Sequence, residues 1–322
     1  MDYLVLVTEG LPEGVGKRPA GAHRGKEKNG WGAVLGVLVL GLVWLGLRYR
    51  IRKAGPVKKV RWQERKESGL VKTDAKFEGR VVPVELGESS YPIYIGWEVL
   101  GDFGRTFVEH CGSKQALVIT DENVAGWYGQ AVVESLARAG VWAQAAAVPA
   151  GETSKSLPQL ERLYEKMFDL ALERSDAVVA LGGGVVGDLA GYAAATFKRG
   201  VRLVQVPTTL LAMVDSSIGG KTGINHARGK NMIGSFYQPR MVYADVSVLG
   251  TLPRRELGCG LAETVKHAVI RDGEFFELLE KEWQQILALD QRRMIELVER
   301  NCRIKAAVVS ADEKESGLRG IL

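Results

Sequence analysis

Short β-branched runs alternate with helical segments through the middle of the chain. Alternation of this kind predicts a parallel sheet with helices on both faces, because each crossover between parallel strands lays a helix on the sheet. After Pro253 the pattern becomes helical almost to the end. The predicted fold class is therefore a Rossmann-related α/β domain followed by the start of an α-helical domain. The strand-like runs lie at 115–121, 141–151, 176–184 and 202–209, and the helical segments between them at 129–140, 156–173 and 185–197.

The charge of the chain is unevenly distributed. The formal net charge is +5, and the basic excess lies in the first 66 residues, whereas charges of both signs alternate from about Gly79 onward. We therefore expect a leader at 1–78, an α/β domain at 79–250 and the first part of a helical domain at 251–322. The basic residues are not interleaved with aromatic ones, so we expect no nucleic-acid partner.

The leader contains an uncharged apolar stretch at 31–47. Its length of about 17 residues is the lower limit for crossing a bilayer core. Basic residues flank it, with the heavier cluster on the carboxyl side, which predicts a transmembrane helix with the following enzyme portion in the cytoplasm. The alternative is a leader outside the folded domain. The three cysteines are odd in number and widely spaced, so a disulfide framework is not expected and a reducing compartment is favoured.

A glycine-rich turn follows the strand-like run in DAVVALGGGVVGD, 176–188. Gly182, Gly184 and Gly187 satisfy G-x-G-x-x-G, and a strand–glycine–helix junction suits a phosphate group because backbone N–H groups are free there. A Rossmann fingerprint also needs an acidic residue about 20 positions later, and VPTTL occupies that place. We therefore expect a nucleotide loop of another type. The alternative is a tight turn without a ligand.

The segment 206–239, VPTTLLAMVDSSIGGKTGINHARGKNMIGSFYQP, combines hydroxyl groups, two lysines and many glycines. A loop of this length inside a compact domain is usually functional or disordered. Its lysines predict a site for a phosphate or another oxyanion.

Several sequence blocks now resemble one family, the 3-dehydroquinate synthases of the shikimate pathway, within the sugar phosphate cyclase superfamily. They are GGGVVGDLAGYAAATFKRG, VPTTLLAMVDSSIGGKTGIN, GKNMIGSFYQP, TLPRRELGCGLAETVKHAVI and ADEKESGLR, and the resemblance covers 81–322. It implies an NAD-binding α/β domain and a helical domain for metal and substrate. It further implies conversion of 3-deoxy-D-arabino-heptulosonate 7-phosphate to 3-dehydroquinate and phosphate, with NAD and zinc or cobalt as cofactors, in a homodimer.

The resemblance also implies site residues. Glu263 is the implied metal ligand, with Lys266 one helical turn later as a substrate contact; the alternative is a solvent-facing Glu–Lys pair. His267 matches no ligand of the family and is expected to be structural. The other implied active-site residues are Arg199, Asp215, Lys221, Lys230, Asn231, Lys305 and Arg319. The implied NAD contacts are Asp121, Asn123, Glu152, Lys155, Gly183, Gly184, Asp188, Thr208, Thr209, Lys221, Lys230 and Thr251.

Single residues of these sets have plainer roles as alternatives. Asp188 and Asp215 could simply cap helices, and Lys305 or Arg319 could be surface charge. The family continues after GLR with a glycine-histidine motif and a second histidine, which supply two metal ligands, whereas this sequence ends at Leu322. We therefore expect a carboxyl-terminally truncated enzyme that is inactive by itself. Alternative functions are another cyclase, such as 2-deoxy-scyllo-inosose synthase, and a non-catalytic NAD-binding remnant.

Overall fold

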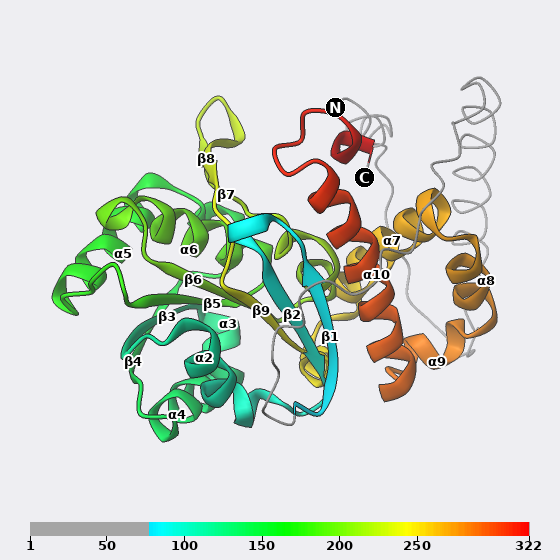
Figure 1. Cartoon of the computed structure of the whole chain (residues 1–322), viewed down its shortest axis with the longest axis horizontal. Coiled ribbons are helices and arrows are strands. Elements are labelled where there is room, and N and C mark those ends of the chain that lie inside the picture. The colour runs from blue at the N-terminus through cyan, green and yellow to red at the C-terminus, as the bar shows by residue number, and fades with distance from the viewer. Residues whose placement is uncertain (1–76, 322) are drawn as a thin grey trace, which may run out of the picture. The chain divides into compact units, whose positions relative to one another are not determined.

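The computed structural model describes residues 77–321, and their centre is a seven-stranded sheet (Figure 1). All neighbouring strands are parallel except β1 and β2, which form an antiparallel hairpin. The predicted α/β fold class is confirmed. In spatial order the strands are β1 (Gly79–Val84), β2 (Tyr91–Gly96), β9 (Met241–Asp245), β6 (Arg202–Pro207), β5 (Ala177–Gly182), β3 (Gln115–Asp121) and β4 (Trp142–Val148).

The hairpin of β1 and β2 accommodates two prolines. Pro83 lies opposite Pro92 in the antiparallel register. Proline has no N–H for a sheet ladder and is tolerated at edges and strand ends. β1 is an edge strand, and β9 pairs with β2 only from Ile93 onward, so neither proline interrupts the parallel sheet.

Helices cover both faces of the parallel strands. Along β5, Ala177, Val179 and Leu181 belong to one buried cluster, and Val178 and Ala180 belong to the other. Side chains of a strand alternate between faces, so a strand buried on both sides is apolar throughout. Figure 1 shows the two layers. One face carries α2 (Phe103–Cys111) and α4 (Gln130–Arg138), and the other carries α5 (Leu157–Asp169) and α6 (Gly184–Thr196).

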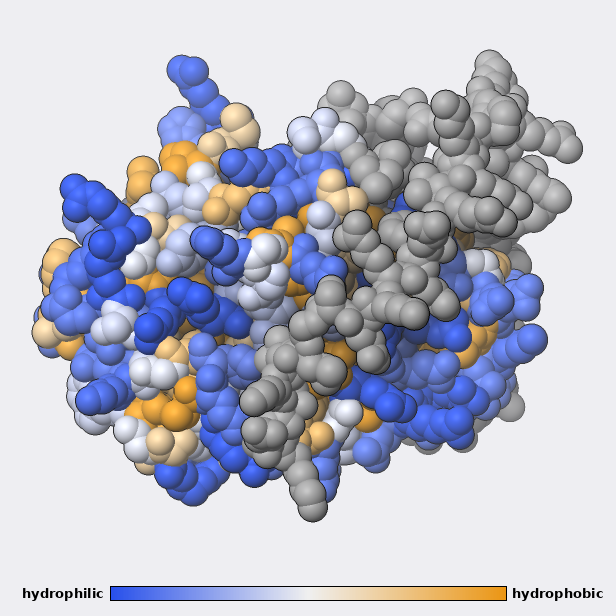
Figure 2. Space-filling model, in the orientation of Figure 1, coloured by the Kyte–Doolittle hydropathy of each residue, from blue (hydrophilic) through white to orange (hydrophobic). Residues whose placement is uncertain are grey.

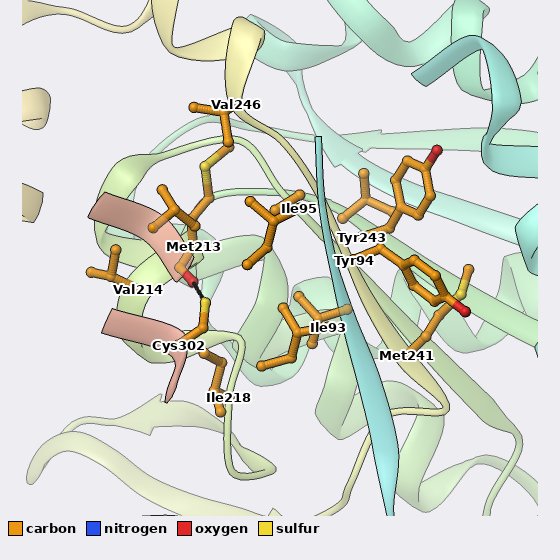
Figure 3. Close-up of a cluster of buried hydrophobic side chains, with 14 of the residues drawn as sticks. Ile93, Tyr94, Ile95, Met213, Val214, Ile218, Met241, Tyr243, Val246 and Cys302 are labelled. Carbon is orange, nitrogen blue, oxygen red and sulfur yellow. Dashed lines mark hydrogen bonds between the residues drawn. The ribbon is translucent and has the colours of Figure 1, made fainter. Parts of the chain in front are cut away.

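Helices follow the last strand, as the sequence predicts. The longest, α10, packs against β1, β2 and α7. Figure 3 shows this part of the core, where Cys302 of α10 lies among Ile93, Met213 and Ile218. The Cys302 Sγ donates a hydrogen bond to the Met213 carbonyl oxygen at 3.4 Å. The helices are α7 (Arg254–Arg271), α8 (Gly273–Lys281), α9 (Trp283–Leu287) and α10 (Gln291–Ala311).

The segment 206–239 contains regular secondary structure and is not one long loop. It contains a π-helical turn, Ala212–Ser216, and a separate antiparallel hairpin of β7 (Lys221–His226) and β8 (Gly229–Phe236). The hairpin projects from the sheet in Figure 1. Its strands lack the alternating apolar pattern, and most residues of β8 are exposed or half-buried. Hydrophobic periodicity therefore gave no signal for this hairpin.

The expected transmembrane helix requires a correction. None of the helices within 77–321 is long and apolar enough to cross a membrane. The stretch 31–47 itself lies outside the described residues. The prediction of a membrane anchor and of a membrane-anchored location is wrong and is not retained. The face seen in Figure 2 mixes hydrophilic residues with scattered apolar ones.

Candidate active site

The turn between β5 and α6 brings the backbone close to two polar side chains. A Cβ atom at Gly183 would lie 2.9 Å from Thr209 Cγ2, and one at Gly184 would lie 3.0 Å from Ser216 Oγ. Larger residues would therefore push into the space beside the turn. Within the described part of the chain, no side chain caps the first turn of α6. Its N–H groups remain available for an anion.

A cavity of about 890 Å³ opens beside this turn. We call it the nucleotide cavity. Its walls come from the carboxyl ends of β3, β5 and β6 and from the loops that follow them, which is where open parallel sheets bind ligands. It brings together residues that are far apart in the sequence. The predicted NAD contacts that line it are Asp121, Asn123, Glu152, Lys155, Gly183, Gly184, Asp188, Thr208, Thr209 and Thr251.

Lys155 is the centre of a polar network in the nucleotide cavity. Its side chain is 4% exposed, and its Nζ lies 2.6 Å from a carboxylate oxygen of Asp188. Nζ also donates to Asn231 Oδ1 on β8. Burial raises the pKa of Asp188, and the hydrogen bond and charge of Lys155 partly offset that rise. The pair therefore joins the glycine turn to the β7–β8 hairpin.

A second cavity, of about 580 Å³, adjoins the first. We call it the cationic cavity. Asp188, Asp215 and Ser216 line both cavities, so ligands in the two would be neighbours. The predicted active-site residues that line the cationic cavity are Asp215, Lys221, Asn231, Lys305 and Arg319.

The cations of this cavity are held by carboxylates and carbonyl oxygens. Lys305 is 8% exposed, and its Nζ lies 2.5 Å from Asp215 Oδ1. The Lys221 ammonium pairs with Glu315. The Arg319 guanidinium donates to the Gly219 carbonyl oxygen at 2.9 Å and to the Glu313 carbonyl oxygen at 2.6 Å. Burial lowers the pKa of Arg319, although neighbouring carboxylates oppose the change.

Glu263, Lys266 and His267 share one face of α7, because residues three and four positions apart meet on a helix. Lys266 Nζ lies 2.6 Å from Glu263 Oε1, and His267 Nε2 lies 3.1 Å from the same oxygen. Burial alone would raise the pKa of Glu263, but these two neighbours outweigh it and lower the pKa. Asp215, which lies in the π-helical turn Ala212–Ser216, is close to Glu263 and His267. Asp215, Glu263 and His267 each offer one ligand atom, and the three atoms lie within 4.8 Å of one another.

Two of the implied site residues lie elsewhere in the structure. Arg199 lines a separate cavity with Arg174, Arg202 and Arg240. Lys230 is exposed on β8 and lines neither the nucleotide cavity nor the cationic cavity. Glu263 and Lys266 also line neither cavity, but they contact each other, and Glu263 lies close to Asp215, which lines both cavities.

The structure adds residues that the sequence analysis did not select. Ser216 lines both cavities, and its buried Oγ lacks a hydrogen-bond partner among the described residues. Trp127 is 69% exposed and lines the nucleotide cavity beside Tyr128. Ser216 follows Asp215 directly, which is a usable signal. The sequence around Trp127 carries none, because its position depends on the π-helical segment Ala125–Gly129.

Solved structures with this fold indicate the class of protein. A 2-deoxy-scyllo-inosose synthase, described as complexed with carbaglucose-6-phosphate, NAD+ and Co2+, matches with a TM-score of 0.70 and 27% identity over 75% of this chain and 67% of that one. A 2-epi-5-epi-valiolone synthase from Streptomyces hygroscopicus, with NAD+ and Zn2+ bound, matches with a TM-score of 0.66 and 28% identity. The match covers 73% of this chain and 65% of that one. Fold and site together define an α/β enzyme of the sugar phosphate cyclase superfamily.

Sequence comparison narrows this class to one family. The model of the 3-dehydroquinate synthase N-terminal region matches 145–259, and that of the C-terminal region matches 260–322. The 3-dehydroquinate synthase of Desulforamulus reducens is 54% identical over 241 residues, 75% of this chain and 67% of the relative. The chloroplastic enzyme of Arabidopsis thaliana is 48% identical over 244 residues, 75% of this chain and 55% of the relative. The chain belongs to the 3-dehydroquinate synthase family, which confirms the resemblance and the predicted function.

Proposed function

We propose that this chain converts 3-deoxy-D-arabino-heptulosonate 7-phosphate to 3-dehydroquinate and phosphate in its two adjoining cavities, with NAD and a divalent metal ion, zinc or cobalt. The observation that carries the proposal is the shared wall of Asp188, Asp215 and Ser216. A nucleotide on one side of this wall and an anionic sugar on the other would be in contact.

The polar groups that line the nucleotide cavity are suited to NAD. Thr208 Oγ1 and Ser216 Oγ are buried and lack a hydrogen-bond partner within the described residues. Buried hydroxyl groups normally have partners, so a ligand in this cavity would satisfy them. The N–H groups of the glycine turn are suited to the pyrophosphate. NAD supplies a hydride acceptor that is restored within the same turnover.

Two carboxylates of the nucleotide cavity can receive ribose hydroxyl groups. Asp121 Oδ1 accepts from the backbone N–H groups of Asn123 and Val124, which orients the side chain and leaves its second oxygen available. Glu152 Oε1 accepts from Asn225 Nδ2 at 2.9 Å. Both carboxylates follow the ends of neighbouring strands. They can do the work of the acidic residue that is absent from the Rossmann position.

The cationic cavity fits a substrate with a phosphate and a carboxylate. Lys221, Lys305 and Arg319 present positive charge to one space of about 580 Å³. Each cation is already oriented by an oxygen partner, so little side-chain freedom is lost when an anion binds. The Asp215 carboxyl group beside Lys305 can accept a hydrogen bond from a substrate hydroxyl group.

Glu263 is the residue that we propose for the metal ion. Its lowered pKa keeps the carboxylate ionised near neutral pH. Its Oε1 lies 2.6 Å from Lys266 Nζ, which holds the carboxylate in one orientation. Together with Asp215 and His267, Glu263 offers ligand atoms that lie within 4.8 Å of one another, a donor set that fits a divalent cation. The metal ion supplies a positive centre for the hydroxyl oxygens of the substrate.

Phosphate release from the heptulosonate phosphate tests the proposal. Release that requires both NAD and zinc or cobalt would support the proposal, whereas no release with both present would agree with the expectation that this chain is inactive by itself. Release that does not depend on NAD would contradict the proposal. Binding of NAD and the sugar phosphate without any release would favour the non-catalytic alternative. The 27% identity to the inosose synthase, against 54% to a 3-dehydroquinate synthase, argues against another cyclase. The homodimer is part of the same proposal, and light scattering tests it.

A further inference from the structure

Trp127 is a large apolar side chain that the core does not bury. It is 69% exposed, yet it lines the nucleotide cavity and not the cationic cavity. We propose that its indole ring stacks on the adenine base of NAD and sets how tightly that end of the dinucleotide is held. The inference rests on the proposed function, because it takes NAD as the occupant of this cavity.

The two cavities fix the direction in which NAD would lie. Asp188, Asp215 and Ser216 line both cavities, so the nicotinamide ring, which must meet the sugar, belongs beside them. The N–H groups at the start of α6 suit the pyrophosphate that joins the two halves of NAD. The adenine half is therefore directed to the part of the wall that the cationic cavity does not share. Trp127 lies in that part.

The segment that carries Trp127 begins at a carboxylate proposed above for a ribose. Asp121 Oδ1 accepts from the N–H groups of Asn123 and Val124, and so caps the short helix that follows β3. Trp127 comes next, in the π-helical segment Ala125–Gly129. A base is bonded directly to its ribose, so a ring that stacks on the base has to lie close to the group that holds the ribose.

The residue after Trp127 anchors this segment to the opposite wall of the cavity. The Tyr128 hydroxyl oxygen lies 2.8 Å from Thr251 Oγ1 and 3.2 Å from the Val248 carbonyl oxygen. Thr251 itself lines the nucleotide cavity. The backbone at Trp127 is thus held before and after the ring, by the helix cap and by Tyr128. Little backbone freedom remains to be lost when a base binds, which favours affinity.

The other side chains at this end of the cavity also suit a base. Three apolar residues, Val124, Leu252 and Pro253, share the part of the wall that belongs to the nucleotide cavity alone. A purine has two flat faces that stack on aromatic rings, and loss of one such stack typically lowers affinity about 5- to 100-fold. Contact with a base would also remove the exposed indole surface from water.

Calorimetric titration of the full chain with NAD, AMP and nicotinamide mononucleotide separates the two halves of the ligand. The variants are Trp127→Ala and Trp127→Phe, and the control is Trp142→Ala, which removes an exposed tryptophan that lines neither cavity. Trp127→Ala should lower the affinity for NAD and for AMP about tenfold and leave that for nicotinamide mononucleotide unchanged. Trp127→Phe keeps an aromatic face and should recover most of the NAD affinity. The control should bind all three like the unaltered chain.

Tryptophan fluorescence gives a readout that a purely structural role would not change. AMP should quench the emission of the unaltered chain and of the control, and this quenching should be absent from Trp127→Phe. Normal NAD affinity of Trp127→Ala, an equal loss for AMP and nicotinamide mononucleotide, or unchanged quenching in Trp127→Phe would overturn the inference and leave the proposed function standing. Failure of the unaltered chain to bind NAD would contradict the inference and the NAD part of the proposed function together.

Discussion

The Lys155 ammonium lies 2.6 Å from a carboxylate oxygen of Asp188, and its side chain is only 4% exposed. Lys155 follows the turn Glu152–Ser154, and Asp188 lies in the second turn of α6. The same ammonium contacts Asn231 of β8. One buried charge therefore ties three segments of the site together, and the energetic roles of these residues can be separated by substitution.

Replacing Lys155 with methionine should destabilise the fold. The change leaves the half-buried Asp188 carboxylate without its cation, and the free energy of unfolding should fall by about 2–3 kcal/mol. Urea denaturation measures this. The double variant with Asp188→Asn should recover part of the loss, because no buried charge then remains unpaired. Equal stability of the single variant and the unaltered chain would show that the pair is not needed for folding.

Replacing Gly184 with alanine should weaken NAD binding about tenfold, or about 1.4 kcal/mol. The new Cβ atom would lie 3.0 Å from Ser216 Oγ and would enter the space at the start of α6. The matched control is Gly258→Ala on α7, where a Cβ atom meets no heavy atom within 4 Å. Calorimetry should show unchanged NAD affinity for the control. The same loss in both variants would argue against a specific role for the glycine turn.

Replacing Lys305 with methionine should distinguish the ligand of the cationic cavity from the ligand of the nucleotide cavity. Affinity for the sugar phosphate should fall at least tenfold, because a cation of the cationic cavity is lost, whereas NAD affinity should change much less. Lys314→Met is a suitable control, since Lys314 is exposed and lines neither cavity. Competition binding with inorganic phosphate gives a second measure. An equal loss of affinity for NAD and for the sugar phosphate would contradict the assignment of NAD to the nucleotide cavity and of the sugar phosphate to the cationic cavity.

Asp312 should make stability depend on pH in the acid range. Its carboxylate accepts from the backbone N–H groups of Ser316, Gly317 and Arg319. Hydrogen bonds from the Arg319 and Ser316 backbone lower the pKa of Asp312 from 3.8 to about 2. A lowered carboxyl pKa stabilises the fold above the unfolded-state value, and that contribution is lost as pH falls toward 2.

The variant Asp312→Asn tests this dependence. Its stability deficit relative to the unaltered chain should be present at pH 5 and should shrink between pH about 4 and about 2. Urea denaturation across this range measures the difference. A deficit that stays constant with pH would show that the ionised form of Asp312 is not what holds the turn before Arg319.

Much of the nucleotide cavity was predictable because its residues follow strand ends. Asp121 ends β3, Glu152 lies shortly after β4, and Asp188 lies shortly after β5, and parallel strands bring such positions to one edge of a sheet. The β7–β8 hairpin was not predictable, since its order comes from contacts with α6 and from the Lys155 network and not from apolar periodicity. Arg199 matched a motif, but its backbone adopts a φ of 63° and its side chain lines another cavity.

The surroundings of His267 show a second limit of sequence reasoning. Spacing places His267 on the face of Glu263, but only the tertiary structure brings its Nδ1 within 2.9 Å of Asn301 Oδ1, 34 residues away. The transmembrane prediction failed for a different reason. It depended on the apolar character of one short stretch, which is a weak criterion near the lower length limit.

The central claim is that the nucleotide cavity binds NAD, and a calorimetric titration of the purified 322-residue chain with NAD tests it most directly. We predict saturable binding at one site per chain and a rise in the thermal unfolding temperature, because a ligand that binds only the folded state stabilises it. The absence of both binding heat and thermal shift at millimolar NAD, in protein shown to be folded by circular dichroism, would contradict the claim.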